Sequence, residues 1–279
     1  MSTLFPNSKI VGAQYVALSS EEWRKMGTTE VTKADTSDRN GVRENTLLDP
    51  AMGCTSGHNT VCKTCENISC MCVGHFGITE LSEPVFNPTY LNAVMMVLRY
   101  VCHSCACVNA NIPPAECNRI LSLKSSNARL ACTKKHCKTD LCVHCKEPQL
   151  RWKTKKKDGL VLLHGDRHVQ AKEILELFER ISTVDARLLG FEETGTQPAN
   201  MLIKVMPIPP NSIRPQIIKE SGARGENELT HRYSDALREA TRLGEDKDTG
   251  KGVTTGRMNA LQYFTAVCND STMPCPKNV

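Results

Sequence analysis

The chain has 279 residues, of which 40% are hydrophobic, so it can bury a sizeable core and disorder is not expected. The chain has fifteen cysteines, an odd number, and no basic region followed by an apolar region after Met1. Both features argue against a secreted disulfide scaffold and favour a reducing compartment inside the cell. A net charge of +5 permits a polyanionic partner, whereas an aromatic content of 5% argues against a base-stacking platform as the main surface. The sequence has no run of 18 apolar residues, so a membrane span is not predicted.

The amino-terminal third combines a short capped helix with a cysteine-rich segment that has no clear periodicity. Ser19, followed by acidic residues, predicts the start of a helix that ends near Met26. Residues 42–86 carry Gly, Asn, Ser and Pro between the cysteines, which predicts irregular backbone held by metal rather than by a local core. Asn87 and Pro88 then open a helix with apolar residues at helical spacing, namely Leu91, Val94, Met95 and Leu98.

The first metal-ligand pattern is a CxxC pair, six residues, and a CxxH pair. Four thiolate or imidazole donors in two tight turns are the number and type that a tetrahedral structural zinc takes. We therefore predict that one zinc ion binds Cys62, Cys65, Cys72 and His75. Gly74 is expected to let the backbone turn so that Cys72 and His75 face the same ion. The sequence does not decide which imidazole nitrogen binds.

A second pattern joins two further CxxC pairs and predicts a four-thiolate zinc site of the zinc-ribbon type, formed by Cys102, Cys105, Cys142 and Cys145. Three donors lie near the last pair in sequence and stay open as replacements for one ligand: Cys132, His136 and Cys137. His103 and His144 lie inside the ligand turns, where support of the site or exposure to solvent is expected. The remaining cysteines are expected to be spectators: Cys54, Cys70, Cys107, Cys117, Cys268 and Cys275.

A basic segment precedes a turn at Asp158 and Gly159 and a strand expected over residues 160–163. Five cations in seven residues are usually the solvated surface of a hairpin. They could also contact the phosphates of nucleic acid without reading its sequence. The candidate DNA-contacting residues are Arg151, Lys153, Lys155, Lys156 and Lys157.

The carboxy-terminal part is expected to alternate helices with one strand and a proline-rich extended segment, and no internal repeat is evident. Residues 244–256 read as a polar linker. The other predicted elements are helices over 171–182, 183–190, 226–243 and 258–268, and a buried strand over 202–206.

No catalytic constellation accompanies these elements. The chain has no GxxxxGK loop, HExxH motif or nucleophile elbow. Residues 245–248 offer two carboxylates at DxD spacing, but in an expected linker without an apolar wall, so a magnesium site there is not favoured. From its residues alone the chain is a zinc-stabilised binding or scaffold protein.

Several short sequence motifs point to a known family. They begin with the first ligand pattern and continue through Phe76, Gly77 and the Pro84-Val85-Phe86 triplet, and they recur in order over nearly the whole chain, at residues 101–105, 173–175, 189–191, 206–215, 224–230 and 261–264. This series resembles the amino-terminal clamp of the largest subunit of multisubunit DNA-dependent RNA polymerases. The family usually has Pro where this chain has Val73, a change that zinc binding should survive.

The resemblance implies an irregular α+β clamp module with short helices, short strands and two structural zinc ions. Four segments are expected: clamp core with the first zinc site, clamp head with the second, clamp-core helices with the proline-rich segment, and a linker with a terminal helix. Their expected bounds are residues 1–86, 87–165, 166–243 and 244–279.

The resemblance also implies a non-catalytic portion of DNA-directed RNA polymerase, a nucleotidyltransferase, that holds template DNA and the RNA–DNA hybrid during transcription. The family's magnesium-binding aspartates lie in an NADFDGD-type motif that this sequence lacks, so Mg²⁺ is expected only in the complete polymerase. The implied partners are the remainder of the largest subunit, the second-largest subunit, smaller subunits, DNA and the RNA–DNA hybrid, with no membrane.

A chain that runs from Met1 to Val279 looks like a split or truncated largest subunit. Its divergent, cysteine-rich sequence favours a large DNA virus as the source. The expected location is the nucleus or cytoplasm, or a virion or viral factory. The alternative function is a stand-alone zinc-ribbon adaptor or transcription factor.

Overall fold

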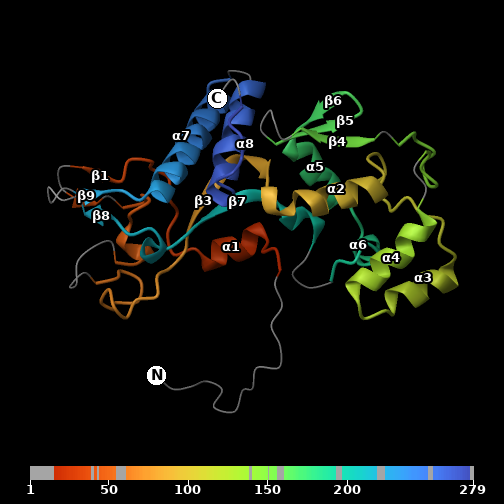
Figure 1. The fold of residues 1–279 in the computed structure, drawn as a ribbon, viewed down its shortest axis with the longest axis horizontal. Helices are drawn as coiled ribbons and strands as arrows, with labels where there is room; N and C mark the ends of the chain where they lie inside the picture. Colours follow the sequence, from red (N-terminus) through yellow and green to blue (C-terminus); the bar gives the residue numbers. More distant parts are fainter. Residues whose placement is uncertain are drawn as a thin grey trace, which may run out of the picture.

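A computed structural model describes residues 16–38, 41–42, 44–54, 61–137, 140–149, 151–155, 160–192, 197–218, 224–250 and 254–276. Its centre is a long antiparallel pair of strands, β3 (Gly77–Phe86) and β7 (Leu202–Ile208), which lie between the two halves of the molecule in Figure 1. The register of this pair shifts between Glu80 and Val85, around Pro84, which has no N–H to give to the ladder.

The expectation of irregular backbone over residues 42–86 is wrong for residues 77–86, which form β3. The first three and last three residues of the strand are buried without interruption, because neighbouring elements cover both of its faces. A strand buried on both faces lacks the alternation of polar and apolar residues by which a strand is recognised in a sequence.

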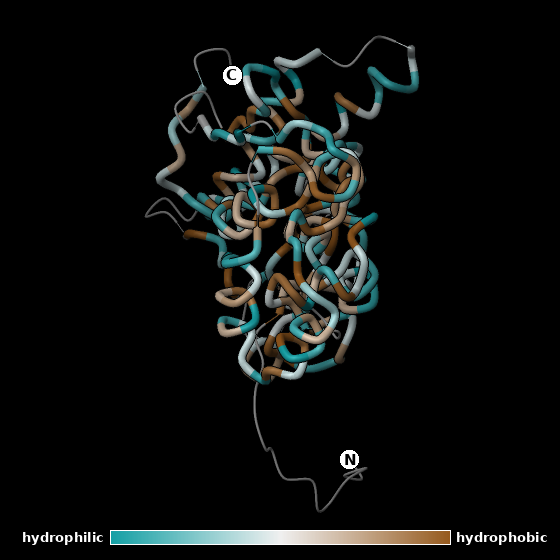
Figure 2. Tube along the Cα trace, turned by 90° about the vertical axis from the view of Figure 1, so that its right-hand side faces the viewer, coloured by the Kyte–Doolittle hydropathy of each residue, from teal (hydrophilic) through white to brown (hydrophobic). Residues whose placement is uncertain are grey.

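One half of the molecule, which we call the base lobe, consists of the described residues before Phe86 and after Leu202. Helices α7 (Glu228–Asp248) and α8 (Thr255–Asn269) pack against each other and against β3, and α1 (Ser20–Met26) packs against β7. The base core contains Val31, Leu47, Met52, Leu81, Val85, Ile203, Met206, Ile208, Tyr233, Ala236, Leu237, Ala240, Leu243, Met258 and Leu261. Figure 2 shows hydrophobic segments running through the interior of the molecule.

Smaller elements complete the base lobe. Two short strand pairs and two 3₁₀ turns connect the larger elements in chain order. They are β1 (Ser37–Asp38) with β2 (Gly41–Val42), η1 (Pro50–Met52), η4 (Asn211–Ile213), and β8 (Ile217–Ile218) with β9 (Arg224–Gly225).

The predicted linker over 244–256 is wrong at its start, because α7 continues to Asp248. Two ion pairs hold this last part of the helix: Asp246 bonds to Arg257 at 2.7 Å, and Lys247 pairs with Glu83. The DxD carboxylates therefore belong to a helix end, and one of them already has a cationic partner. Partners so distant in sequence give no local signal that the helix should extend.

The other half, the insert lobe, is the stretch between β3 and β7. Its helices and turns are η2 (Pro88–Tyr90), α2 (Leu91–Tyr100), α3 (Pro114–Leu121), α4 (Ser126–His136), α5 (Ala171–Glu179), α6 (Thr183–Leu188) and η3 (Pro198–Met201). A three-stranded sheet of β4 (Trp152–Lys155), β5 (Val161–His164) and β6 (Arg167–Val169) covers α2 and α5. The strand pairing of the predicted hairpin is confirmed, with Trp152 opposite His164, and the predicted turn at Asp158 and Gly159 lies outside the described residues.

A second core fills this lobe. Its buried residues include Phe86, Leu91, Val94, Val97, Leu98, Val101, Val108, Leu160, Leu162, Ile174, Leu177, Phe178, Leu189, Met201 and Leu202. The division of the chain into four segments stays a prediction; the buried residues form two cores, and the strand pair enters both. Among the described residues, no helix combines the length and the apolar character that crossing a membrane requires.

One side-chain amide joins the two lobes where β3 leaves the base lobe. Gln262 of α8 is 8% exposed; its Oε1 accepts from the Phe86 backbone N–H at 2.7 Å, and its Nε2 donates to the Phe86 carbonyl at 2.9 Å. The amide thus occupies the position of a neighbouring strand at the last residue of β3. A base-lobe helix therefore fixes the first residue of the insert core.

Candidate metal centres

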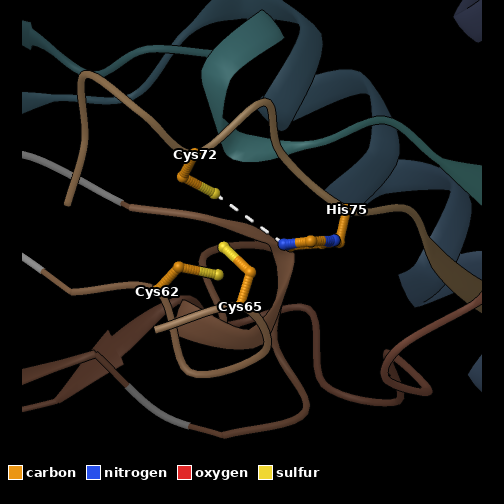
Figure 3. Close-up of side chains that lie close together, drawn as sticks. All are labelled: Cys62, Cys65, Cys72 and His75. Atoms are coloured by element: carbon orange, nitrogen blue, oxygen red, sulfur yellow. Dashed lines mark hydrogen bonds between the residues drawn. The ribbon is translucent and has the colours of Figure 1, made fainter. Parts of the chain in front are cut away.

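The first predicted ligand set comes together in the base lobe. The sulfur atoms of Cys62, Cys65 and Cys72 and an imidazole nitrogen of His75 all lie within 4.8 Å of one another. Figure 3 shows the four side chains pointing to a common centre, with Nε2 of His75 directed inward. Nε2 lies 3.8 Å from the Cys72 sulfur. The structure therefore places Nε2, and not Nδ1, at the cluster.

The second predicted set comes together in the insert lobe. Cys102, Cys105, Cys142 and Cys145 also lie within 4.8 Å of one another. The sulfur atoms of Cys102 and Cys145 are 3.6 Å apart, and those of Cys105 and Cys142 are 3.7 Å apart. The two CxxC pairs interlock, since each thiol contacts one from the other pair.

These spacings can be compared with those of a bound zinc. Sulfurs at about 2.3 Å from a tetrahedral zinc lie about 3.8 Å from each other, and a sulfur and a nitrogen lie about 3.6 Å apart. The observed sulfur–sulfur distances of 3.6 and 3.7 Å and the sulfur–nitrogen distance of 3.8 Å agree with these donor–donor separations within about 0.2 Å. Disulfides need a separation of about 2.0 Å, which none of these pairs has. The donors and their spacing thus fit one zinc ion in each cluster.

The three competing donors lie elsewhere. Cys132 and His136 are on α4, and Cys137 follows it with its thiol bonded to the Thr133 carbonyl at 3.3 Å. Burial raises the pKa of Cys137 to about 11, which keeps this thiol protonated. In the part of the chain that the structure describes, only the two predicted sets bring three or more such donors within reach of a single ion.

Each CxxC pair lies on the same kind of turn, a repeat that the sequence analysis missed. In all three turns the N–H of the first cysteine donates to the carbonyl of the residue five positions later. The N–H of the residue after the second cysteine donates to the carbonyl of the first cysteine. The residue after the second cysteine has a left-handed backbone with φ of 57° at Glu66, 59° at Ala106 and 64° at Lys146. The sequence carried a signal for this repeat, because an apolar residue precedes each CxxC pair and an apolar residue or proline stands three positions after its second cysteine. These flanking residues pair across the turn: Val61 with Ile68, Val101 with Val108 and Leu141 with Pro148.

The repeated turn explains the burial of the donors. The first cysteine of each pair, Cys62, Cys102 or Cys142, is fully buried, whereas the second is more exposed. Amide hydrogens inside the turn point to the buried sulfur, as the Thr64 N–H does to Cys62 at 3.4 Å. Such N–H groups stabilise a thiolate, which is the form that binds metal.

Distant segments support the first cluster. Gly74 has φ of +88°, and a Cβ at this position would lie 2.4 Å from Cβ of Pro210, so both the backbone conformation and the packing require glycine. Asn211 is buried and donates to the carbonyls of Asp49 at 2.9 Å and Gly53 at 3.0 Å. The proline-rich segment after β7 therefore forms one wall of this site, a role that its sequence did not indicate.

Supporting groups at the second cluster were also missed. Nε2 of Gln149 donates to the Cys102 sulfur at 3.3 Å. His144 lies 3.1 Å from the Val108 carbonyl, and the His103 ring packs against that of His164 at 4.5 Å. Neither histidine belongs to the donor cluster, as predicted.

Thiol acidity differs within each cluster. The imidazole of His75, with the Asn67 N–H, lowers the pKa of Cys65 to about 6, whereas burial raises that of Cys72 to about 11. In the second cluster, burial acts to raise the pKa of Cys102, but N–H groups of Cys105 and Ser104 outweigh it and lower the pKa to about 7. One thiol in each cluster is therefore poised to lose its proton near neutral pH.

Comparison with known proteins identifies the family. The family model described as RNA polymerase Rpb1, domain 1 matches residues 7–279. The chain belongs to this family. It is 34% identical over 272 residues to DNA-directed RNA polymerase subunit Rpo1N of Methanothermobacter thermautotrophicus strain Delta H, covering 94% of this chain and 31% of the relative.

Other relatives of this Rpb1 domain are also Rpo1N subunits. Identity is 31% over 287 residues with subunit Rpo1N of Sulfolobus acidocaldarius, covering 96% of the chain and 32% of the relative. The Rpo1N subunit of Methanocaldococcus jannaschii is 29% identical, with 92% of the chain and 20% of the relative covered. The chain thus spans about a third or less of these relatives, and its viral origin stays a prediction.

Proposed function

We propose that this chain is the amino-terminal clamp portion of the largest subunit of a DNA-directed RNA polymerase, and that it holds DNA and the RNA–DNA hybrid. The family match over residues 7–279 carries this proposal. The chain is non-catalytic by itself. The magnesium-binding aspartates belong to the remainder of the largest subunit, which, with the second-largest and smaller subunits, is the expected partner.

Two structural zinc ions brace the two lobes. The first binds Cys62, Cys65, Cys72 and Nε2 of His75, and the second binds Cys102, Cys105, Cys142 and Cys145. Each cluster closes a region rich in turns, where short segments bury little apolar surface and metal binding supplies folding free energy instead. Four protein donors leave no open position for a substrate, so the role of each zinc is structural.

The distribution of charge supports contact between the insert lobe and nucleic acid. Residues 87–201 contain 17 Lys and Arg against 11 Asp and Glu, whereas the rest of the chain has 18 against 19. The positive excess of the chain therefore lies in this lobe. A polymerase must move over any sequence, and contacts from cations to phosphates do not depend on sequence.

The predicted DNA-contacting residues lie along the β4–β5 hairpin of this lobe. Arg151 and Lys153 are exposed, and Lys155 ends β4. Lys156 and Lys157 fall outside the described residues. This basic ribbon is proposed to contact the DNA backbone.

Metal analysis tests the zinc proposal. The full chain should contain two zinc ions. Cys62→Ser and Cys142→Ser should each reduce the content to one and destabilise one lobe, since structural zinc contributes on the order of 10 kcal/mol. Cys70→Ser and Cys117→Ser are matched controls outside both clusters and should keep two ions. Full zinc content in Cys62→Ser would contradict the first ligand set.

Purification from the native source tests the clamp assignment. The tagged chain should bring down a polymerase assembly that contains a chain with the catalytic aspartates. Recovery of the chain free of polymerase subunits would favour the stand-alone adaptor or transcription factor instead.

Neutralising the basic ribbon tests its DNA contacts. Lys153→Gln together with Lys155→Gln should weaken retention of duplex DNA by the assembled polymerase and flatten the salt dependence, by a slope of about 0.9 per lost contact. Lys33→Gln with Lys204→Gln, in the base lobe, is the control with an equal change in charge. Equal retention by the ribbon variant and the wild type at low salt would show that the ribbon is a solvated surface.

A further inference from the structure

Two arginines of the insert lobe differ from the rest. Among the arginines whose side chains the structure describes, all others bind a carboxylate or a carbonyl oxygen, as Arg24 does with Glu80 and Arg180 with the Ser104 carbonyl. Within that described part of the chain, Arg99 and Arg151 have no such side-chain hydrogen bond or ion pair. Both are exposed, and both line the same pocket.

This pocket has a volume of about 390 Å³ and lies between α2, the start of β4 and the third cysteine turn. Met95 and Leu98 of α2 give it an apolar wall, and Trp152 of β4 also lines it. The Trp152 ring stacks on His164 at 4.2 Å with an angle of 20° between the planes, a contact that supports one face of the indole. Two unpaired guanidinium groups thus lie beside an aromatic ring and an apolar wall.

The side of the pocket formed by the third cysteine turn supplies hydrogen-bond acceptors. Asp140 and Gln149 line the pocket, and their backbones bond to each other at 2.9 Å. Nε2 of Gln149 is engaged by the Cys102 sulfur and by the Glu147 carbonyl, so its Oε1 is the atom left to accept a bond. Every nucleobase carries an N–H donor on its pairing edge, which a carboxylate or amide oxygen can accept.

We propose that this pocket binds one unstacked nucleotide of a single-stranded nucleic acid: Arg99 and Arg151 bind the backbone phosphates, and the base lies against Trp152. A concave pocket of this size receives an extruded base, whereas a duplex presents stacked bases inside a convex rod. Aromatic stacking of a base is sequence-tolerant and contributes favourable binding energy with a cationic groove. The pocket is continuous with the basic ribbon through Arg151.

This inference rests on the proposed function and names a single strand as the ligand of the insert lobe. An acidic peptide is the competing occupant, because two arginines would also bind its carboxylates. The aromatic and apolar walls favour the nucleotide, since an acidic side chain has no apolar face to bury there.

The test compares two double variants of the full, zinc-loaded chain by the anisotropy of a labelled 15-nucleotide oligo(dT). Arg99→Ala with Arg151→Ala should raise Kd at least about tenfold and reduce the salt slope by about 1.4, as expected for two lost phosphate contacts. Arg119→Ala with Arg167→Ala is the control, because these exposed arginines of the same lobe pair with glutamates and their loss changes the net charge equally. Equal losses in the two double variants would overturn the proposal.

Tryptophan emission provides a direct readout of stacking. The chain has two tryptophans, so Trp23→Phe leaves Trp152 as the single reporter. Oligo(dT) should quench its emission, and a glutamate-rich peptide of equal charge should not. Oligo(dT) that binds without quenching Trp152, or quenching by the peptide as strong as by oligo(dT), would overturn the proposal.

Failure of this inference is distinguishable from failure of the proposed function. If oligo(dT) does not bind while the chain still assembles with polymerase subunits and retains duplex DNA, the pocket proposal alone is refuted. If the chain neither assembles with polymerase subunits nor binds nucleic acid, both are refuted.

Discussion

Replacing Gln262 should uncouple the two lobes. Its amide makes both hydrogen bonds available at the backbone of Phe86, the residue where β3 passes from one core to the other. Gln262→Ala removes both bonds and leaves a buried N–H and a buried carbonyl without these partners. Each such group costs about 1 to 3 kcal/mol, so we expect a loss of about 2 to 6 kcal/mol in the free energy of unfolding.

The two tryptophans allow each lobe to be followed separately. Trp23 packs on Phe76 in the base lobe, and Trp152 stacks on His164 in the insert lobe. In urea, single-tryptophan forms of the wild type should unfold at the same midpoint, because the amide ties the lobes together. The same forms carrying Gln262→Ala should unfold at lower and separate midpoints.

A matched control uses the same helix. Asn269 is exposed at the end of α8, and its amide donates only to the Thr265 carbonyl at 3.4 Å, so Asn269→Ala should change stability by less than about 0.5 kcal/mol. A Gln262→Ala variant that matches this control, with coincident midpoints, would refute the coupling.

Gln262→Glu adds a dependence on pH. Only a protonated carboxyl can donate to the Phe86 carbonyl, and burial disfavours the charge, so the pKa of the introduced carboxyl in the folded state should rise above its unfolded value of about 4.3. The folded variant then binds more protons than the unfolded chain between these two values. Its deficit relative to wild type should grow as pH rises through this window and shrink as pH falls, with both proteins measured at each pH. A deficit independent of pH would contradict the donor role of the amide.

Three further substitutions test the supports of the base lobe. Gly74→Ala forces a Cβ to 2.4 Å from Pro210 at φ of +88°, so it should cost at least about 2 kcal/mol and speed zinc release to a chromophoric chelator; an unchanged release rate would contradict this. Glu66→Gly relieves a left-handed backbone and should raise stability in urea by about 0.5 kcal/mol, an expectation that a lower midpoint would exclude. Arg214 is 1% exposed and donates to the carbonyls of Leu47 and Pro209, so Arg214→Met should lower the free energy of unfolding by about 3 kcal/mol; a loss below about 1 kcal/mol would count against it.

Local signals in the sequence were sufficient to find the paired candidate donors and most helices. Ser19 caps α1 as predicted, and Gly190 follows α6 with φ of +90°. Such features depend on residues within one turn of each other, so spacing alone reveals them. The same holds for the CxxC and CxxH pairs, whose members must lie within one turn to reach one ion.

Tertiary structure decided which distant parts meet. Cys102 meets Cys145 across 43 residues, and Gly77 of β3 pairs with Ile208 of β7 across 131 residues, contacts for which no local pattern exists. The end of α7 depends on Arg257, beyond the helix, and the wall of the first cluster depends on Pro210. The sequence by itself determined the donor types and their pairing into tight turns, because both are local chemistry. Only the fold determined how those turns combine, and which two of the described arginines have no partner, because both depend on packing between segments far apart in the chain.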